Sequence, residues 1–449
     1  MLPSGTPMAR ILAITLVVAV STAKAQQPVA ITGVTVIDGT GRAPQRRTTV
    51  LVQGGQIVAV GRDGTVRIPA RAERIVARGK YLVAGLWDTH VHLGALGRDG
   101  LPSLVRHGIT SVRDLGGELA AVRTWRDEAE RGDWLGPRIR LAGPIVENAL
   151  WLKRVRSLGI PGLSRGLEER IPVETEADAV KAVDSIAAMG VEVLKVRYAP
   201  GTAAYTALLA AAQRKGLRVA GHQPNPAIGL GGALIAGQRS IEHIEGLGEL
   251  GTLAPALRDS LARAYAAADV WITPTLAASF GRFVPDSVTE ARVTGTSTDP
   301  DLPMVTSTLR DFWKAQRELK AYDSPLDQYA RMVSEGLAGL RSLRAAGVKL
   351  MAGTDLGVLT LTPGRSLHQE LKFLVDSLGL SPLEAIQSAT VEPARYFGQG
   401  ASMGTVESGR LADLVLLNAD PLTDIRNIAT VDLVILRGRV VRVAESAPR

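Results

Sequence analysis

Short apolar runs with strand character alternate with helical segments along most of the chain, and this alternation constrains the fold more than any other feature. It is typical of parallel sheets, because each helix crosses back over the sheet before the next strand begins. Eight such runs predict an α/β fold of the (β/α)8 TIM-barrel type over residues 83–403. They are Val83–His90, Thr110–Arg113, Ile139–Ala142, Val193–Val196, Arg218–His222, Ser240–His243, Trp271–Thr275 and Lys349–Gly353.

Helical periodicity separates these strands. Helices are expected at Glu176–Met189, Ala203–Lys215, Gln328–Ala346 and Leu367–Leu378. Two connections are much longer than the others, at residues 144–172 and 277–327. Long loops at the carboxyl ends of barrel strands usually shape the pocket, so we expect substrate choice to reside in these two segments.

The two ends of the chain share a different sequence pattern. Residues 26–82 contain short β-type runs separated by glycine turns such as Gly54-Gly55, and residues 404–449 return to the same pattern. We therefore expect these segments to form one small β-sandwich domain beside the barrel.

The first 25 residues have the pattern of a signal peptide. Arg10 precedes the apolar stretch Ile11–Val20, and Ala23-Lys24-Ala25 provides small residues for cleavage. The stretch is shorter than the span needed to cross about 30 Å of hydrocarbon. The sequence thus predicts a secreted or periplasmic protein with no stable membrane anchor after cleavage.

Composition excludes several kinds of site. The chain has no cysteine, so disulfides, thiol nucleophiles and cysteine-bound metals are ruled out. The net charge of +8 is scattered without a basic run, which argues against nucleic acid as a partner. Any metal must therefore be held by histidine and oxygen ligands.

Potential metal ligands recur at the predicted strand ends. His90 and His92 lie two apart, so their side chains share one face of a strand, and neutral imidazole is a preferred zinc ligand. Four further candidates fall at comparable heights on other strands: Lys195, His222, His243 and Asp355. Barrel enzymes build their active sites at this rim, and six ligating groups suffice for two metals.

These motifs resemble those of the amidohydrolase superfamily, within its secreted imidazolonepropionase-like and prolidase-like members. The resemblance spans nearly the whole chain after the signal segment. It rests on the segments Gly85–His92, Thr110–Gly117, Leu194–Val196, Ala220–His222, Ser240–His243, Ala352–Asp355 and Gly409–Val415.

The resemblance implies a pair of divalent metals, with zinc as the expected ion. His90, His92 and Asp355 would bind the more buried metal, His222 and His243 the other, and Lys195 would bridge both after its amine adds carbon dioxide. The resulting carbamate is an anion with two oxygens and behaves as a bridging carboxylate.

Hydrolysis is the reaction that such a site implies. A metal-bridging hydroxide would attack a carbonyl, with Asp355 taking the proton and passing it to the leaving amine. We expect an amide substrate, most simply a dipeptide or an N-acyl amino acid. Arg197 and Tyr198 follow Lys195 closely and are candidates for binding the carboxylate of the leaving group, although an exposed loop pair would show the same pattern.

Other functions stay open. A mononuclear deaminase would lack a bridging lysine, a lactam or lactone hydrolase would use the same site, and a non-catalytic barrel could bind only metal or ligand. His107 and His368 are interpreted as packing residues. Ser164 matches a nucleophile-elbow pattern without the required strand and helix. The helical exterior permits a homo-oligomer without specifying one.

Overall fold

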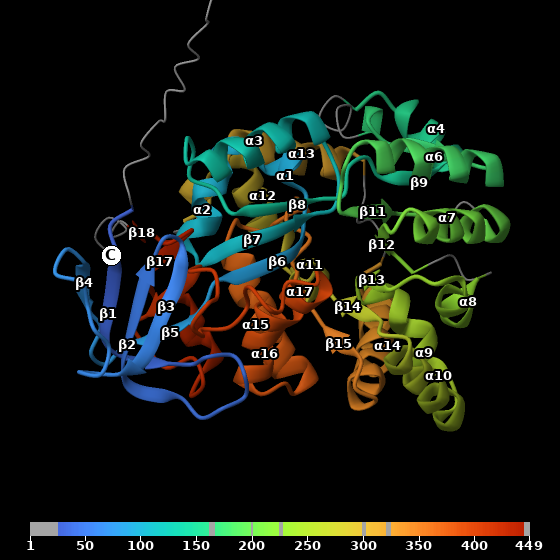
Figure 1. Cartoon of the computed structure of the whole chain (residues 1–449). Coiled ribbons are helices and arrows are strands. Elements are labelled where there is room, and N and C mark those ends of the chain that lie inside the picture. The colour runs from blue at the N-terminus through green and yellow to red at the C-terminus, as the bar shows by residue number, and fades with distance from the viewer. Residues whose placement is uncertain are drawn as a thin grey trace, which may run out of the picture.

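The computed structural model describes residues 26–160, 167–198, 201–223, 228–298, 302–319 and 325–443. The predicted signal peptide and Ser164 lie outside these ranges. In Figure 1 a β-rich body made from both ends of the chain stands beside a larger body of strands and helices. No helix in the described residues combines the length and apolar character needed to span a membrane.

An eight-stranded sheet joins the two ends of the chain. Its order is β18-β17-β16-β5-β1-β2-β3, with β4 paired to β1. Antiparallel pairing of β5 with β16, where Leu82 lies opposite Leu416, connects the N-terminal and C-terminal segments. The strands are β1 (Val29–Val36), β2 (Gln45–Gln53), β3 (Gln56–Arg62), β4 (Glu73–Val76), β5 (Tyr81–Ala84), β16 (Leu414–Leu417), β17 (Val431–Leu436) and β18 (Arg439–Arg442). The expected composite of both ends is thus present as a sheet, and its sandwich form stays a prediction.

The remaining strands pair in parallel. A three-stranded sheet has the order β6-β7-β8, and a seven-stranded sheet has the order β10-β9-β11-β12-β13-β14-β15. The strands are β6 (Leu86–Val91), β7 (Ile109–Asp114), β8 (Arg138–Leu141), β9 (Val146–Asn148), β10 (Ile171–Val173), β11 (Val193–Val196), β12 (Arg218–Gly221), β13 (Ser240–Glu242), β14 (Trp271–Thr273) and β15 (Lys349–Leu350). The α/β fold with parallel sheets is therefore confirmed.

Backbone hydrogen bonds link the two parallel sheets. The Thr89 N–H donates to the Ala352 carbonyl over 3.0 Å, beside β6 and β15. On the other side, the Glu192 N–H donates to the Leu141 carbonyl over 3.0 Å, beside β11 and β8. Apart from β10, which pairs with the outer edge of β9, the strands consequently follow one another around the sheets in chain order.

All eight predicted strands occur, with one boundary corrected. The first begins at Leu86 instead of Val83, because Val83 and Ala84 belong to β5 of the terminal sheet. The apolar run looks continuous in sequence, but Gly85 separates two strands that belong to different sheets. The expected boundary between residues 82 and 83 therefore cuts through β5.

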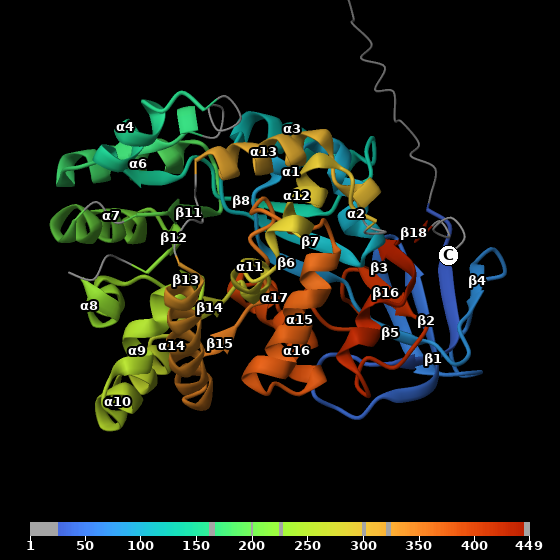
Figure 2. The ribbon, with the colours of Figure 1, turned by 180° about the vertical axis from the view of Figure 1, so that it is seen from behind.

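Helices surround the parallel strands. The four expected helices appear as α6 (Glu176–Ala188), α7 (Thr202–Arg214), α14 (Leu326–Ala345) and α15 (Arg365–Leu378). Figure 2 shows α15 and α16 between the terminal sheet and α14. The other described helices are α1 (Leu93–Leu96), α2 (Leu101–Arg106), α3 (Leu119–Arg131), α4 (Ala149–Arg156), α8 (Gly229–Ala236), α9 (Gly248–Thr252), α10 (Pro255–Ala267), α11 (Leu276–Gly281), α12 (Asp286–Thr294), α13 (Ser307–Glu318), α16 (Pro382–Ser388) and α17 (Val391–Tyr396), with short 3-10 turns at Arg98–Gly100, Glu245–Leu247, Leu302–Met304 and Ile425–Ala429.

Candidate metal centre

The six residues singled out from the sequence meet at the carboxyl ends of the parallel strands. His90 and Lys195 lie on β6 and β11. His92, His222 and His243 directly follow β6, β12 and β13, and Asp355 lies in the segment after β15. All except His90 line one cavity of about 890 Å³, and His90 is fully buried beneath it. The structure therefore brings the six residues together at the carboxyl ends of the strands, where the sequence predicted them.

Short distances connect the cluster. The Oδ1 atom of Asp355 lies 3.2 Å from His92 Nε2 and 3.4 Å from His90 Nε2, and one ligand atom from each of these three residues falls within 4.8 Å of the others. Lys195 Nζ lies 3.3 Å from His90 Nε2. These atoms can therefore converge on a common ion.

The second histidine pair lies against the first. The His243 ring centroid is 4.7 Å from that of His90 and 4.3 Å from that of His222. His222 thus extends the cluster away from His90 and His92. Asp355 connects the two pairs, because its Oδ2 atom lies 3.9 Å from His243 Nδ1.

Two of the cluster residues have a left-handed backbone. His243 has φ 72° and Asp355 has φ 67°, a region that residues other than glycine rarely adopt. Such positions cost of order 1–3 kcal/mol and concentrate at functional sites. Here each lies where the chain leaves a parallel strand, and each side chain turns into the cluster.

Hydrogen bonds orient the imidazoles. His92 Nδ1 donates to the Gly116 carbonyl over 2.9 Å, which leaves Nε2 facing Asp355. His243 Nδ1 lies 2.8 Å from the Thr275 hydroxyl. His243 Nε2 is buried and has no hydrogen-bond partner among the described residues. Because a buried polar atom without a partner is unfavourable, that nitrogen fits a metal ligand.

Burial keeps several of these histidines neutral. It lowers the pKa of His90, His222 and His243, and neighbouring positive groups lower the pKa values of His90 and His222 further. Burial alone would raise the pKa of Asp355, but His90 and His243 outweigh it and hold that pKa below its usual value. Neutral imidazoles and an ionised carboxylate are the protonation states that metal binding requires.

Lys195 is buried inside the cluster with almost no exposed surface. Burial lowers its pKa to about 8, although Glu242 and Asp355 oppose that shift. A lysine amine in this position is closer to its neutral, nucleophilic form than an exposed lysine.

A buried ion pair that sequence reasoning missed supports His90. Glu242 on β13 lies 2.9 Å from His90 Nδ1 and accepts from Arg113 Nη2 on β7, with both carboxylate oxygens at 2.8 Å. Arg113 and Glu242 are both fully buried. The available signal was a charged residue within each of two strands of the parallel sheets.

Asp88 fixes the segment that precedes Asp355. It accepts from the Thr354 backbone N–H over 2.9 Å and from the Thr354 hydroxyl over 2.7 Å. Burial raises the pKa of Asp88 to about 7. The start of the first parallel strand is thereby tied to the loop that follows the last one.

Arg197 and Tyr198 line the cavity, as the substrate hypothesis requires. The Arg197 guanidinium lies 3.5 Å from Glu147 and 4.3 Å from the centre of the Trp151 ring. The Tyr198 ring is 41% exposed, with its centroid 5.8 Å from that of His222. Both side chains therefore line the same cavity as the candidate ligands, and Glu147 already partly neutralises the charge of Arg197.

Both long connections contribute to the cavity wall, with Trp151 and Arg170 from the first and Asp311 and Phe312 from the second. The other two histidines lie elsewhere. His368 Nε2 donates to the His107 carbonyl over 2.9 Å, and neither side chain lines the cavity. Their assignment to packing agrees with these contacts.

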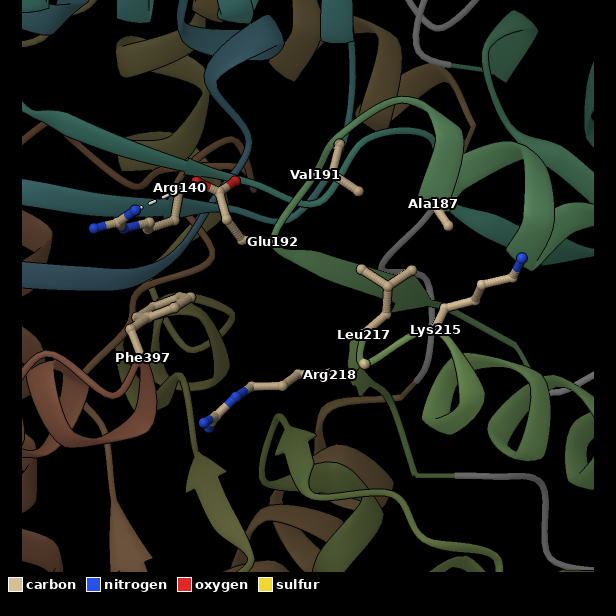
Figure 3. Close-up of a pocket in the computed structure, with 9 residues that line it drawn as sticks. Arg140, Ala187, Val191, Glu192, Lys215, Leu217, Arg218 and Phe397 are labelled. Atoms are coloured by element: carbon tan, nitrogen blue, oxygen red, sulfur yellow. Dashed lines mark hydrogen bonds and ion pairs between the residues drawn. The ribbon is translucent and has the colours of Figure 1, made fainter.

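A second cavity, of about 410 Å³, lies at the opposite ends of the strands (Figure 3). Arg140, Arg218 and Phe397 form part of its wall, and Arg140 pairs with Glu192 over 3.4 Å. No histidine or aspartate lines it. Of these two cavities, the first is therefore the one whose described lining includes histidine and aspartate side chains.

Comparison with known proteins identifies related sequences. Residues 81–441 match the protein-family model described as the amidohydrolase family. An ochratoxinase from Aspergillus niger is 38% identical over 82 residues, which is 18% of this chain and 16% of that protein. An imidazolonepropionase from Aromatoleum aromaticum is 41% identical over 78 residues, covering 17% of this chain and 19% of the relative. The matched segments thus span less than a fifth of these curated relatives.

The likeness to solved structures is broader. A Bifidobacterium longum protein proposed to be a prolidase has a TM-score of 0.71 and 26% sequence identity. The alignment covers 95% of this chain and 96% of the other. The whole architecture, including the terminal sheet, therefore has a counterpart in a known structure.

Proposed function

Because the chain belongs to the amidohydrolase family, we propose that it is a binuclear metal-dependent hydrolase that cleaves an amide C–N bond in a dipeptide or an N-acyl amino acid. One observation carries the proposal: four histidines, one lysine and one aspartate converge at one end of the strands, and His243 Nε2 is buried there without a partner in the described residues.

The donor set suits two divalent ions, with zinc the expected metal. His90, His92 and Asp355 would hold one ion, and His222 and His243 the other. Lys195 would serve both as a carbamate, since an unmodified ammonium group would repel the ions. When bound, the ions would polarise the substrate carbonyl and lower the pKa of a water molecule.

The protein's own groups would manage the proton and the substrate. Asp355 would accept a proton from the attacking water and deliver it to the leaving nitrogen, because its carboxylate reaches the centre of the cluster. Arg197 and Tyr198 would bind the carboxylate of the leaving amino acid at the cavity wall. Unchanged kcat/KM in both Arg197→Ala and Tyr198→Phe would refute this second role.

Metal content tests the centre directly. We expect two divalent ions per chain by plasma mass spectrometry, and fewer in Lys195→Ala. We also expect release of amino acids from dipeptides or N-acyl amino acids, abolished in Asp355→Asn. One ion independent of Lys195, with ammonia as the product, would instead indicate a mononuclear deaminase. Cleavage of cyclic amides or esters alone would indicate a lactam or lactone hydrolase. Bound metal without any turnover would indicate a binding protein.

Three structural proposals accompany this function. The two parallel sheets form one closed (β/α)8 barrel, supported by the hydrogen bonds at their edges. The terminal sheet folds as a small sandwich domain around its own apolar core. The chain is exported and cleaved after residue 25, which an N-terminal mass measurement on secreted protein would test.

A further inference from the structure

A carboxylate that the hydrolytic reaction does not use lies in the wall of the metal-centre cavity. Glu245 follows His243 by two residues and begins a short 3-10 turn after β13. It lines the same cavity as Lys195 and His222. Its side chain is therefore within the space that a substrate would occupy.

Neutral groups hold Glu245 in place. Its Oε1 atom accepts from the Tyr329 hydroxyl over 2.9 Å and from the Ser279 hydroxyl over 3.0 Å. These bonds anchor one oxygen to α14 and α11. The hydroxyl groups orient the carboxylate but do not neutralise its charge.

No lysine or arginine of the described residues forms an ion pair with Glu245 within 4.0 Å. Arg282 also lines this cavity, and its guanidinium lies 3.7 Å from the centre of the Tyr329 ring. An oriented, partly buried carboxylate without a cationic partner is a suitable site for a positive group on a ligand.

A positive charge, that of Arg197, lies on another part of the cavity wall. Arg197 follows β11, whereas Glu245 follows β13, and His222 after the intervening β12 lies between them in strand order. A dipeptide with both ends free has its carboxylate on the leaving residue, its ammonium on the acyl residue and the scissile carbonyl between them. The two wall charges follow strands on either side of the one that His222 follows, and this order matches the order of groups in the dipeptide.

We propose that Glu245 binds a cationic group on the acyl side of the substrate. This proposal rests on the amide-hydrolase function and narrows its substrate class to peptides whose acyl residue carries a free ammonium group. N-acyl amino acids with neutral acyl groups would then be poorer substrates. The positive group could be the α-ammonium or a basic side chain, and both present the same chemistry to the carboxylate.

A structural role for Glu245 must be separated from this one. Glu245→Gln retains an oxygen that can accept from Tyr329 and Ser279, so it removes the charge and preserves the anchor. Asp311→Asn is the matched control. Asp311 also lines the cavity, but its carboxylate already pairs with Lys314 Nζ over 3.0 Å.

The experiment compares kcat/KM for three substrates that share the leaving amino acid and differ in the acyl residue. The acyl residues are alanyl, N-acetylalanyl and Nα-acetyllysyl. We expect wild type to prefer the alanyl substrate. Glu245→Gln should lower that preference about ten- to a hundredfold, the range for a charge-assisted hydrogen bond, while changing N-acetylalanyl cleavage less than about threefold. Asp311→Asn should leave the preference unchanged.

The outcomes distinguish this inference from the hydrolase proposal. If Glu245→Gln lowers kcat/KM for the Nα-acetyllysyl substrate as much as for the alanyl substrate, the site binds a basic side chain as well as the α-ammonium. Cleavage of all three substrates with an unaltered preference in Glu245→Gln would overturn the inference and leave the hydrolase intact. An equal change in Asp311→Asn would overturn it in favour of the general field of the cavity. No cleavage of any amide by a metal-loaded enzyme would overturn both.

Discussion

Removing one member of the buried pair between Arg113 and Glu242 should destabilise the protein strongly. Both side chains are fully buried, and Arg113 Nη2 donates to both Glu242 oxygens over 2.8 Å. Breaking a buried pair by deleting one partner costs about 3–5 kcal/mol, because the other charge is left uncompensated. Arg113→Met and Glu242→Leu should therefore each lower the unfolding free energy of the metal-free protein by that amount.

The double variant should lose less unfolding free energy than the two single variants lose together. It removes both charges, and its remaining cost comes mainly from the groups that lose an acceptor, His90 Nδ1 and the Ser240 hydroxyl. At about 4 kcal/mol for each single variant and about 2 kcal/mol for each of the two unsatisfied groups, the coupling between the two positions should be about 4 kcal/mol.

Urea denaturation of the four metal-free proteins measures this coupling, with the slopes compared to verify a common unfolding transition. Metal titration of the folded variants provides a second readout. Loss of Glu242 should weaken metal binding about ten- to a hundredfold, since the partner of a ligating imidazole sets its orientation. Additive free energies, or single-variant losses below about 1 kcal/mol, would refute the reasoning.

Two further predictions follow from buried groups near the strands. Burial raises the pKa of Glu370 to about 8, so its contribution to stability is full below the unfolded pKa near 4.5 and is lost as the pH rises through 8. Glu370→Gln keeps an acceptor for the Ala277 N–H, so it should flatten that pH dependence and raise the unfolding free energy by a few kcal/mol relative to wild type at pH 8–9. Urea midpoints of the two proteins that change in parallel between pH 5 and 8.5 would contradict this. Gly353→Ala would place a Cβ 2.5 Å from Thr273 Cγ2 and 2.8 Å from the His90 backbone nitrogen. It should cost about 1–3 kcal/mol and lower metal affinity, and an unchanged melting temperature together with unchanged metal content would contradict the steric argument.

The local pattern of the sequence determined most of what lies along single strands. Apolar runs predicted eight of the ten parallel strands, and their ends located the six residues of the candidate metal centre. The short strands β9 and β10 were missed, since they lie in a segment expected to be a long loop. This worked because strand ends are marked by short-range features, and parallel strands place those ends at the same edge. The pattern failed at Val83, where one apolar run continues across Gly85 from one sheet to another.

Only the tertiary structure decided which side chains support and surround that centre. Glu242 meets His90 from 152 positions away and Arg113 from 129, and Glu245 meets Tyr329 from 84. A charged residue in a strand or after it can equally face solvent, so its sequence neighbourhood does not reveal its partner. The candidate metal ligands could be predicted from the sequence because their chemistry is unusual at each position. Their supporting partners were not, because an ordinary carboxylate or guanidinium acquires its role only from what the fold packs against it.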